Sequence, residues 1–240
     1  MTSLKPRNII IIGAGPLMSR SLSLYLASHK WQIILISRKH PSLLSYAAEI
    51  NTFHPEAPKV LVHTGDASIP SSLTEALNWA AEQVSGKVDV VCYNAAHVAP
   101  SPLLELQPET LVQDFNITAT GTLVAGQWFM NHANTSHLDE GEHPLFLVPG
   151  GMLDRYPDPN ISALCATKSA NLSLRLGRSI IMRRGWSGFL RRFGCRREVM
   201  ELREQMARIS LIWMYYWEND GRIRELSMIL KNIIEDVLKG

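Results

Sequence analysis

Short runs of apolar, mostly β-branched residues recur through the first two-thirds of the chain, without the apolar–polar alternation of a half-exposed strand. The runs are Asn8–Ile12, Gln32–Ile36, Lys59–His63, Val88–Tyr93 and Leu145–Val148. Continuous apolar runs of this length are typical of strands that are buried on both faces of a parallel sheet. We therefore expect a parallel strand at each run.

Segments with the apolar spacing of helices separate these runs. They are Leu17–His29, Pro41–Thr52, Ser71–Val84, Pro108–Asn131 and Ser162–Ile181. Strands that alternate with helices build βαβ units, in which the connecting helices pack on the faces of the sheet. The pattern predicts an α/β fold, namely a Rossmann-type doubly wound parallel sheet flanked by helices, in a single domain over residues 1–240.

The composition is that of an ordinary globular protein and predicts no special partner. Of the 240 residues, 46% are hydrophobic and 19% are charged, and the formal net charge of +2 is too small to predict binding to nucleic acid or a membrane. The cysteines, Cys92, Cys165 and Cys195, match neither a disulfide framework nor a zinc site. The isoleucine run near the N-terminus is too short for a signal peptide or a membrane span. We therefore expect a cytoplasmic protein that binds no metal, nucleic acid or membrane.

The first predicted strand runs directly into Gly13-Ala14-Gly15-Pro16, and a predicted helix follows. Glycine at such a turn allows a tight bend and lets the backbone approach a pyrophosphate, while the N-terminus of the helix offers unpaired N–H groups. The strand before the motif and the helix after it make this short motif more specific. We therefore predict a dinucleotide-binding site with Gly13, Gly15 and Leu17 in its phosphate loop.

The second predicted strand ends at Ile36 and is followed by Ser37-Arg38-Lys39. In a dinucleotide-binding fold this position meets the adenosine ribose, where an acidic residue would bind the 2′-hydroxyl of NAD(H). Arg38 can instead hold a 2′-phosphate with two parallel hydrogen bonds, and Lys39 adds a second positive charge. The sequence therefore favours NADP(H) over NAD(H), unless Arg38 is only a solvated loop charge.

Several short motifs, in order between residues 8 and 175, resemble the short-chain dehydrogenase/reductase family. Asp66 resembles the acidic residue that contacts adenine, and Asn94-Ala95-Ala96 resembles the N-A-G segment after the fourth strand. Asn116 resembles the helix asparagine of the catalytic tetrad, and Lys168 resembles the lysine of the Y-x-x-x-K motif. The resemblance implies cofactor contacts from Asp66, Asn94 and Lys168, a catalytic setting around Asn116 and Lys168, a small-molecule substrate and a homo-oligomer.

The chain departs from this family at two places. The later glycines of the family's phosphate loop fall at Leu17 and Ser19, so either the turn is wider around Leu17 or Ser19 supplies a hydroxyl to the phosphate. The residue four before Lys168 is Leu164, not the tyrosine that protonates the carbonyl oxygen, and the family serine falls at Gly150-Gly151. A divergent branch of the family resembles this chain in having leucine at that place.

Another group must donate the proton if the chain is an enzyme. Tyr156, in the loop after the fifth predicted strand, is the first surrogate acid, and His97, in the loop after Asn94, is the second. We therefore expect an NADP(H)-dependent oxidoreductase that reduces a carbonyl or oxidises an alcohol on a small organic substrate, such as one of specialised biosynthesis. The alternative is a catalytically inactive NADP(H)-binding protein with a regulatory or structural role.

The pattern of strands and helices ends near Gly177, and residues 177–205 are rich in arginine without a clear strand or amphipathic helix. Farther on, Ile212–Glu218 resembles the divergent branch again, and Arg222–Leu238 has the spacing of a helix. We therefore predict that residues 177–205 are disordered, or that they come from a frameshift or a misjudged splice junction. The rival interpretation is an anionic partner for these arginines and Trp186, but no groove-reading motif or amphipathic face supports it.

Overall fold

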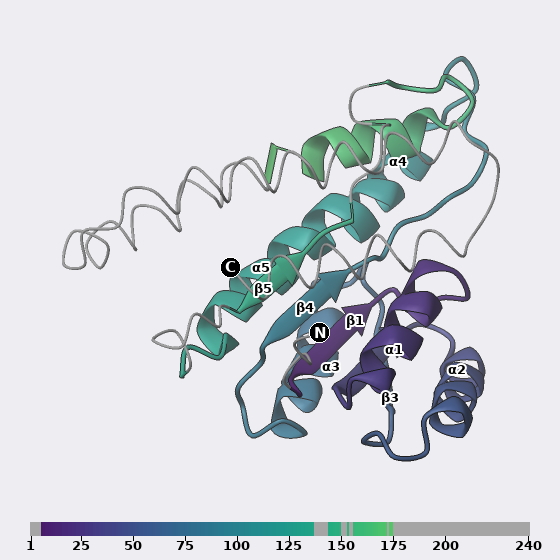
Figure 1. Cartoon of the computed structure of the whole chain (residues 1–240). Helices are drawn as coiled ribbons and strands as arrows, with labels where there is room; N and C mark the ends of the chain where they lie inside the picture. The colour runs from purple at the N-terminus through teal and green to yellow at the C-terminus, as the bar shows by residue number, and fades with distance from the viewer. Residues whose placement is uncertain (1–5, 137–143, 150–152, 154–155, 172, 175–240) are drawn as a thin grey trace, which may run out of the picture. The chain divides into compact units, whose positions relative to one another are not determined.

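The computed structural model describes residues 6–136, 144–149, 153, 156–171 and 173–174 of the chain (Figure 1). Contacts divide the chain into two compact units. The first holds the described residues 6–97, 112–136 and 144–149, and the second holds residues 98–111 with the described residues from 153 to 174. Segments 177–205 and 222–238 lie outside the described residues, so the predictions for them, and for one domain over the whole chain, stay predictions.

A five-stranded parallel sheet forms the centre of the first unit (Figure 1). Its strands are β1 (Asn8–Ile12), β2 (Gln32–Ser37), β3 (Leu61–Thr64), β4 (Val90–Tyr93) and β5 (Leu145–Leu147), in the order β3-β2-β1-β4-β5. Every neighbouring pair is parallel. The chain runs outward from β1 to one side and then to the other, which confirms the doubly wound Rossmann-type sheet.

Helices cover both faces of this sheet. Successive side chains of a strand point to opposite faces, so each strand packs against helices on both sides. The helices are α1 (Met18–Ser28), α2 (His40–Phe53), α3 (Pro70–Glu82) and α5 (Gly121–His132). Ile9 and Ile11 of β1 pack with buried residues of α1 and α2, whereas Ile10 and Ile12 pack with those of α3 and α5. Both faces of the strand are therefore buried, which explains the unbroken apolar run.

The helix predicted over Pro108–Asn131 is interrupted. Helix α4 (Pro108–Phe115) passes into a π-helical turn, η1 (Asn116–Thr120), before α5 begins at Gly121. The N–H of Gly121 donates to the carbonyl of Asn116, five residues earlier. Apolar spacing could not reveal this turn, because the helical segments on both sides keep their own period.

Candidate functional site

The strands β1 and β4 end level with one another and β2 ends one residue later, so the residues that follow them meet at one edge of the sheet. Ile12 of β1 pairs with both Ile36 of β2 and Tyr93 of β4. Gly13 and Asn94 are therefore the first residues beyond two adjacent strands. The strand order reverses between β1 and β4, and doubly wound sheets bind their ligands at the carboxyl edge beside such a reversal.

Gly13 turns the chain at the end of β1 with a φ of +79°. Its N–H donates to the carbonyl oxygen of Ile36 at 2.9 Å. A Cβ at this position would overlap the backbone nitrogen of Ala95 and would lie 2.8 Å from the carbonyl carbon of Asn94. Glycine is therefore required twice, by the left-handed backbone and by the close approach of the chain that follows β4.

The side chains of Ser19 and Asn94 hold this turn in place. The Ser19 hydroxyl donates to the Gly13 carbonyl at 3.3 Å, and the Asn94 Nδ2 donates to Ser19 Oγ at 2.9 Å and to the Gly13 carbonyl at 3.3 Å. Ser19 is buried. The Ser19 hydroxyl is therefore engaged inside the turn, and its contact with a phosphate, one of the two alternatives for this loop, stays a prediction. A direct cofactor contact from Asn94 stays a prediction.

The N-terminus of α1 faces the turn without a side-chain cap. Leu17 is the N-cap residue, its side chain is exposed and makes no capping bond, and the first turn holds no acidic residue. Around Gly15, a Cβ would meet only the Gly13 oxygen, at 4.0 Å. The first-turn N–H groups of a helix lack intrahelical partners, and they bind phosphates in many proteins. A tight turn, open space at Gly15 and an uncapped helix fit the pyrophosphate of a dinucleotide.

Arg38 and Asp66 form the next part of this edge. Arg38 is exposed directly after β2, and Asp66 follows β3. Partial burial acts to raise the pKa of the Asp66 carboxyl. The hydrogen bonds that Ser68 donates from its hydroxyl (2.6 Å) and its N–H (2.8 Å), together with the charge of Arg38, hold that pKa below its ordinary value. Both bonds end on Oδ1. Because the pKa is lowered, Asp66 presents an ionised carboxylate beside a basic side chain.

Tyr93 is buried at the end of β4, and its hydroxyl donates to the carbonyl of Ile117 in the π-helical turn. Burial, and secondarily the charge of Asp66, raise the pKa of this phenol. A Cβ at Gly121 would overlap the Tyr93 hydroxyl, so the glycine that begins α5 makes room for it. Tyr93 therefore anchors the helix of Asn116 to the sheet. Asn116 is half-buried as the first residue of that turn.

His97 and Asp114 come together beside this edge. The His97 Nδ1 lies 2.9 Å from Asp114 Oδ1; the histidine side chain is 43% exposed and the aspartate side chain only 5%. His97 follows Asn94 by three residues, and Asp114 lies in α4 just before the π-helical turn. The sequence indicated His97 as the second surrogate acid but did not identify Asp114 as its partner, because no spacing rule connects positions that far apart. The only available signal was a charged residue on the apolar side of a helix.

The second unit carries Tyr156 and Lys168. Tyr156 is 59% exposed in the loop before a helix that begins at residue 162, and Lys168 is half-buried on that helix. This loop is paired with Ser101, whose N–H donates to the Asn160 carbonyl at 2.8 Å and whose carbonyl accepts the Ser162 N–H at 3.1 Å. Tyr156 as an acid and Lys168 as a cofactor ligand stay predictions.

Leu164 occupies a core position in this helix. It is buried, and its carbonyl accepts the hydroxyl of Thr167 at 3.0 Å. The neighbouring Cys165 is also buried, with its sulfur 3.3 Å from the N–H of Asp158. Leucine has no proton to transfer, so this position cannot act as an acid.

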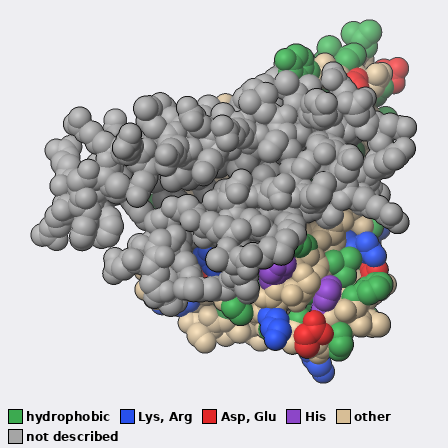
Figure 2. Space-filling view, viewed as in Figure 1, with side chains coloured by type: hydrophobic (Ala, Val, Ile, Leu, Met, Phe, Trp, Pro, Cys, Tyr) green, Lys and Arg blue, Asp and Glu red, His purple; other side chains and the backbone are tan. Residues whose placement is uncertain are grey.

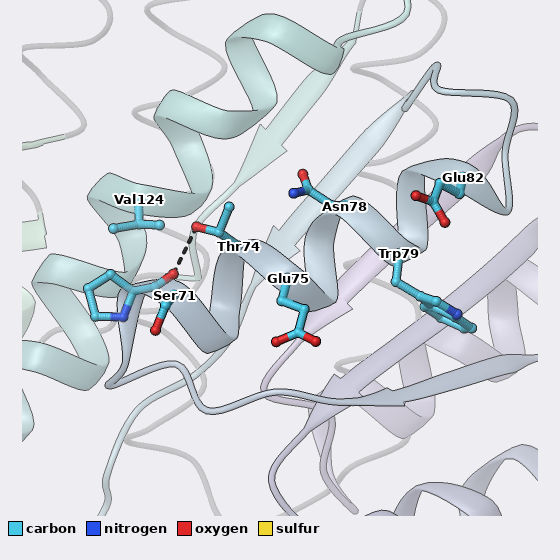
Figure 3. A pocket seen from close by; sticks show the side chains of 8 residues that line it. Ser71, Thr74, Glu75, Asn78, Trp79, Glu82 and Val124 are labelled. Carbon is cyan, nitrogen blue, oxygen red and sulfur yellow. Dashed lines mark hydrogen bonds between the residues drawn. The ribbon is translucent and has the colours of Figure 1, made fainter.

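The surface also holds a pocket that is separate from the glycine turn (Figure 3). It has a volume of 690 Å³ and is lined by Pro70, Ser71, Thr74, Glu75, Asn78, Trp79, Glu82 and Val124. Figure 3 shows the side chains of Glu75 and Glu82 along α3, with Val124 contributed by α5. Two carboxylates and no basic residue make this pocket a poor match for the anionic phosphates of a dinucleotide.

Two further kinds of feature are not found among the described residues, namely a membrane span and a metal site. No helix among them is long and apolar enough to span a membrane. Within the same residues, no group of three or more His, Cys, Asp or Glu side chains is placed to hold a metal ion. The part of their surface visible in Figure 2 mixes basic, acidic, histidine and apolar side chains.

Comparison with known proteins gives a family and a fold. The sequence model of the short chain dehydrogenase family matches residues 7–173, a range that begins just before β1 and includes Lys168. No curated protein sequence matches the chain.

Many solved structures share the fold. A short-chain type dehydrogenase/reductase from Mycobacterium marinum is 19% identical, with a TM-score of 0.65 over 75% of this chain and 70% of that chain. An alcohol dehydrogenase from the archaeon Thermococcus sibiricus, complexed with 5-hydroxy-NADP, is 23% identical, with a TM-score of 0.64 over 73% and 71% of the two chains. A 3-ketoacyl-(acyl-carrier-protein) reductase from Brucella melitensis, complexed with NADH, is 20% identical, with a TM-score of 0.65 over 75% and 71%. At these identities the likeness establishes the fold alone.

Proposed function

Because the chain belongs to the short chain dehydrogenase family, we propose that it is a nicotinamide-dependent oxidoreductase with NADP(H) as its preferred cofactor. The glycine turn is the observation that carries the proposal. Gly13 packs against the chain after β4, and Ser19 and Asn94 hold its carbonyl, while the N-terminus of α1 remains uncapped. A turn fixed in this way can present N–H groups to a pyrophosphate in a set geometry.

Arg38 and Asp66 support the cofactor preference. A guanidinium after the second strand can bind the 2′-phosphate of NADP(H) with two parallel hydrogen bonds. The Asp66 carboxylate can accept a hydrogen bond from the amino group of adenine. Against the effect of burial, the hydrogen bonds from Ser68 and, secondarily, the charge of Arg38 hold the pKa of Asp66 below its ordinary value. Two of the similar structures hold an NADP derivative and NADH respectively, which supports a nicotinamide dinucleotide in this chain as well.

The nicotinamide, when bound, exchanges a hydride with the carbon of a small organic carbonyl or alcohol. We assign Lys168 to the hydroxyls of the nicotinamide ribose, and Asn116 to the support of the helix beside the reacting groups. Tyr156 is the first surrogate proton donor that the sequence predicts. We further propose a homo-oligomer that works in the cytoplasm; the molecular mass measured by sedimentation of the purified chain tests the assembly.

Leu164 favours a second candidate function. A buried leucine stands where the family tyrosine would transfer the proton. Without a substitute for that tyrosine, the chain would bind NADP(H) and regulate or scaffold a partner without turnover. The same glycine turn would serve both functions, so cofactor binding alone does not separate them.

Loss of nicotinamide absorbance in a stopped-flow instrument separates the two functions. An oxidoreductase oxidises NADPH with at least one member of a panel of aldehydes and ketones. Lys168→Ala should lower kcat/KM by about 10- to 100-fold, because bonds to a charged donor contribute roughly 1.5–3 kcal/mol. Lys59→Ala, which removes an exposed lysine before β3, is the matched control and should retain the rate. Binding without turnover on the whole panel would favour the second function, and no binding would contradict both.

A further inference from the structure

We propose that His97, oriented by Asp114, transfers the substrate proton in place of the family tyrosine. The inference rests on the proposed oxidoreductase function and adds to it the missing acid. It is carried by three observations: the buried carboxylate bonded to the ring, the accessibility of that ring, and the position of His97 three residues after Asn94, which bonds to the glycine turn.

The hydrogen bond selects which ring nitrogen can react. An ionised carboxylate only accepts hydrogen bonds, so Asp114 Oδ1 at 2.9 Å requires a proton on His97 Nδ1. Nε2 is then the nitrogen that gains and loses the transferable proton. Asp114 is almost completely buried, whereas 43% of the histidine side chain is exposed, so the carboxylate can hold the ring without closing it off.

The fold places this pair on the side where the nicotinamide should lie. Arg38 and Asp66 follow β2 and β3, and the glycine turn follows β1, so the adenosine and the pyrophosphate take up that half of the edge. The remaining half, beyond the strand reversal, belongs to β4 and β5. His97 comes from the β4 side. Three residues of chain span at most about 11 Å, so His97 stays close to Asn94, which is bonded to the turn itself.

In the reducing direction the electrons and protons balance within the site. A bound, reduced nicotinamide would supply the hydride to the carbonyl carbon, and the π electrons of the carbonyl would move to its oxygen. His97 Nε2 gives its proton to that oxygen, so an N–H bond breaks, an O–H bond forms, and the imidazolium becomes neutral imidazole. Asp114 retains the Nδ1 hydrogen bond throughout. The exposed ring then regains a proton from water, and alcohol oxidation follows the reverse path.

A purely structural role for this pair predicts different behaviour. A buried aspartate bonded to a loop histidine can simply fix the loop after β4. In that case His97→Gln would lower the stability of the fold and leave the rate of hydride transfer unchanged. Rate and stability must therefore be measured on the same variants.

His97→Gln in the full-length protein is the direct test. Single-turnover oxidation of NADPH should slow by about 10²- to 10⁴-fold, the usual contribution of a general acid, while the Kd for NADPH stays within about twofold. Added imidazole should restore part of the rate of His97→Ala. His54→Gln is the matched control, because His54 also has a carboxylate neighbour, Glu56 at 3.9 Å, but lies at the C-terminal end of α2. An unchanged rate in His97→Gln, or a loss confined to Tyr156→Phe, would overturn the proposal.

Nuclear magnetic resonance of the ring nitrogens gives a readout that does not depend on turnover. The His97 ring should carry its proton on Nδ1 in the neutral form, and Asp114→Asn should change the tautomer, because an amide can donate to Nδ1. Adding NADPH should move the His97 ring signals. NADPH binding that leaves these signals in place would overturn the proposal and leave the cofactor site intact. Failure of NADPH to bind in the same titration would instead refute the proposed function.

Discussion

Gly121→Ala places a methyl group where the structure has room for none. The new Cβ would overlap the hydroxyl of Tyr93, and it would lie 2.9 Å from Tyr93 Cζ and 2.7 Å from the carbonyl oxygen of Ala67. The backbone itself accepts alanine, since Gly121 has a helical φ of −61°. The perturbation is therefore a steric clash with the Tyr93 side chain and the Ala67 carbonyl, and not a strained dihedral angle.

The cost can be estimated from its parts. Overpacking a core commonly costs about 1–3 kcal/mol. If Tyr93 moves away, the buried carbonyl of Ile117 loses its donor, at a further cost of roughly 1–3 kcal/mol. Replacing glycine with alanine in a helix returns about 1 kcal/mol. The free energy of unfolding should therefore fall by about 1–5 kcal/mol.

Urea unfolding of four proteins measures this cost and its cause. They are the wild type, Gly121→Ala, Tyr93→Phe and the double variant. Circular dichroism monitors the unfolding, and the free energies are compared where the four proteins have the same dependence on urea concentration. Tyr93→Phe removes the oxygen that the new methyl overlaps, so the double variant should lose at least about 1 kcal/mol less than the sum of the single losses. If Gly121→Ala unfolds within about 0.5 kcal/mol of the wild type, or the losses simply add, this account of the Tyr93 anchor is wrong.

Two further predictions concern the carboxyl edge. Gly13→Ala should lower the free energy of unfolding by more than about 2 kcal/mol, because of the positive φ and the overlap with Ala95. Gly15→Ala, whose new methyl group meets open space, should change the free energy of unfolding by no more than about 0.5 kcal/mol. Urea unfolding of both variants tests this, and equal losses would contradict it. Ser68→Ala should raise the pKa of Asp66 towards its ordinary value, as measured by carboxyl NMR titration, because both donors to Asp66 Oδ1 belong to Ser68 and the hydroxyl is lost. Folding lowers the pKa of Asp66, so its contribution to stability is present above the unfolded-state pKa and is lost as the pH falls through the folded-state pKa; an unchanged titration in Ser68→Ala would refute this.

The fold could be predicted because burial on both faces leaves a strong mark on the sequence. All five predicted strands form, although the third starts at Leu61 instead of Lys59 and the fourth at Val90 instead of Val88. Just before the third strand, the N–H of Val60 donates to the Asn51 side chain at 3.0 Å. A side-chain bond of this kind replaces a ladder bond without changing the apolar pattern. Strand ends are therefore harder to predict than strands.

The candidate site was predictable only where a residue type has one strong local reason. Gly13 was singled out for a phosphate, and the structure shows a second cause, the approach of Ala95 from a distant strand. Ser19 was one of two alternatives for completing the phosphate loop, and nothing in the sequence indicated that its hydroxyl would bond to the Gly13 carbonyl inside the turn. Asp114 was not identified at all, because its partner is brought to it by the fold and not by sequence spacing.

Titration of the purified protein with NADPH and NADH, followed by nicotinamide fluorescence, tests whether the glycine turn and Arg38 form an NADP(H) site. We expect NADPH to bind well below about 1 mM and about 10- to 100-fold more tightly than NADH, because a charge-assisted bidentate pair contributes roughly 1.5–3 kcal/mol. Arg38→Ser should remove most of that difference while leaving the affinity for NADH nearly unchanged. Binding of neither nucleotide at about 1 mM would contradict the dinucleotide site at the glycine turn.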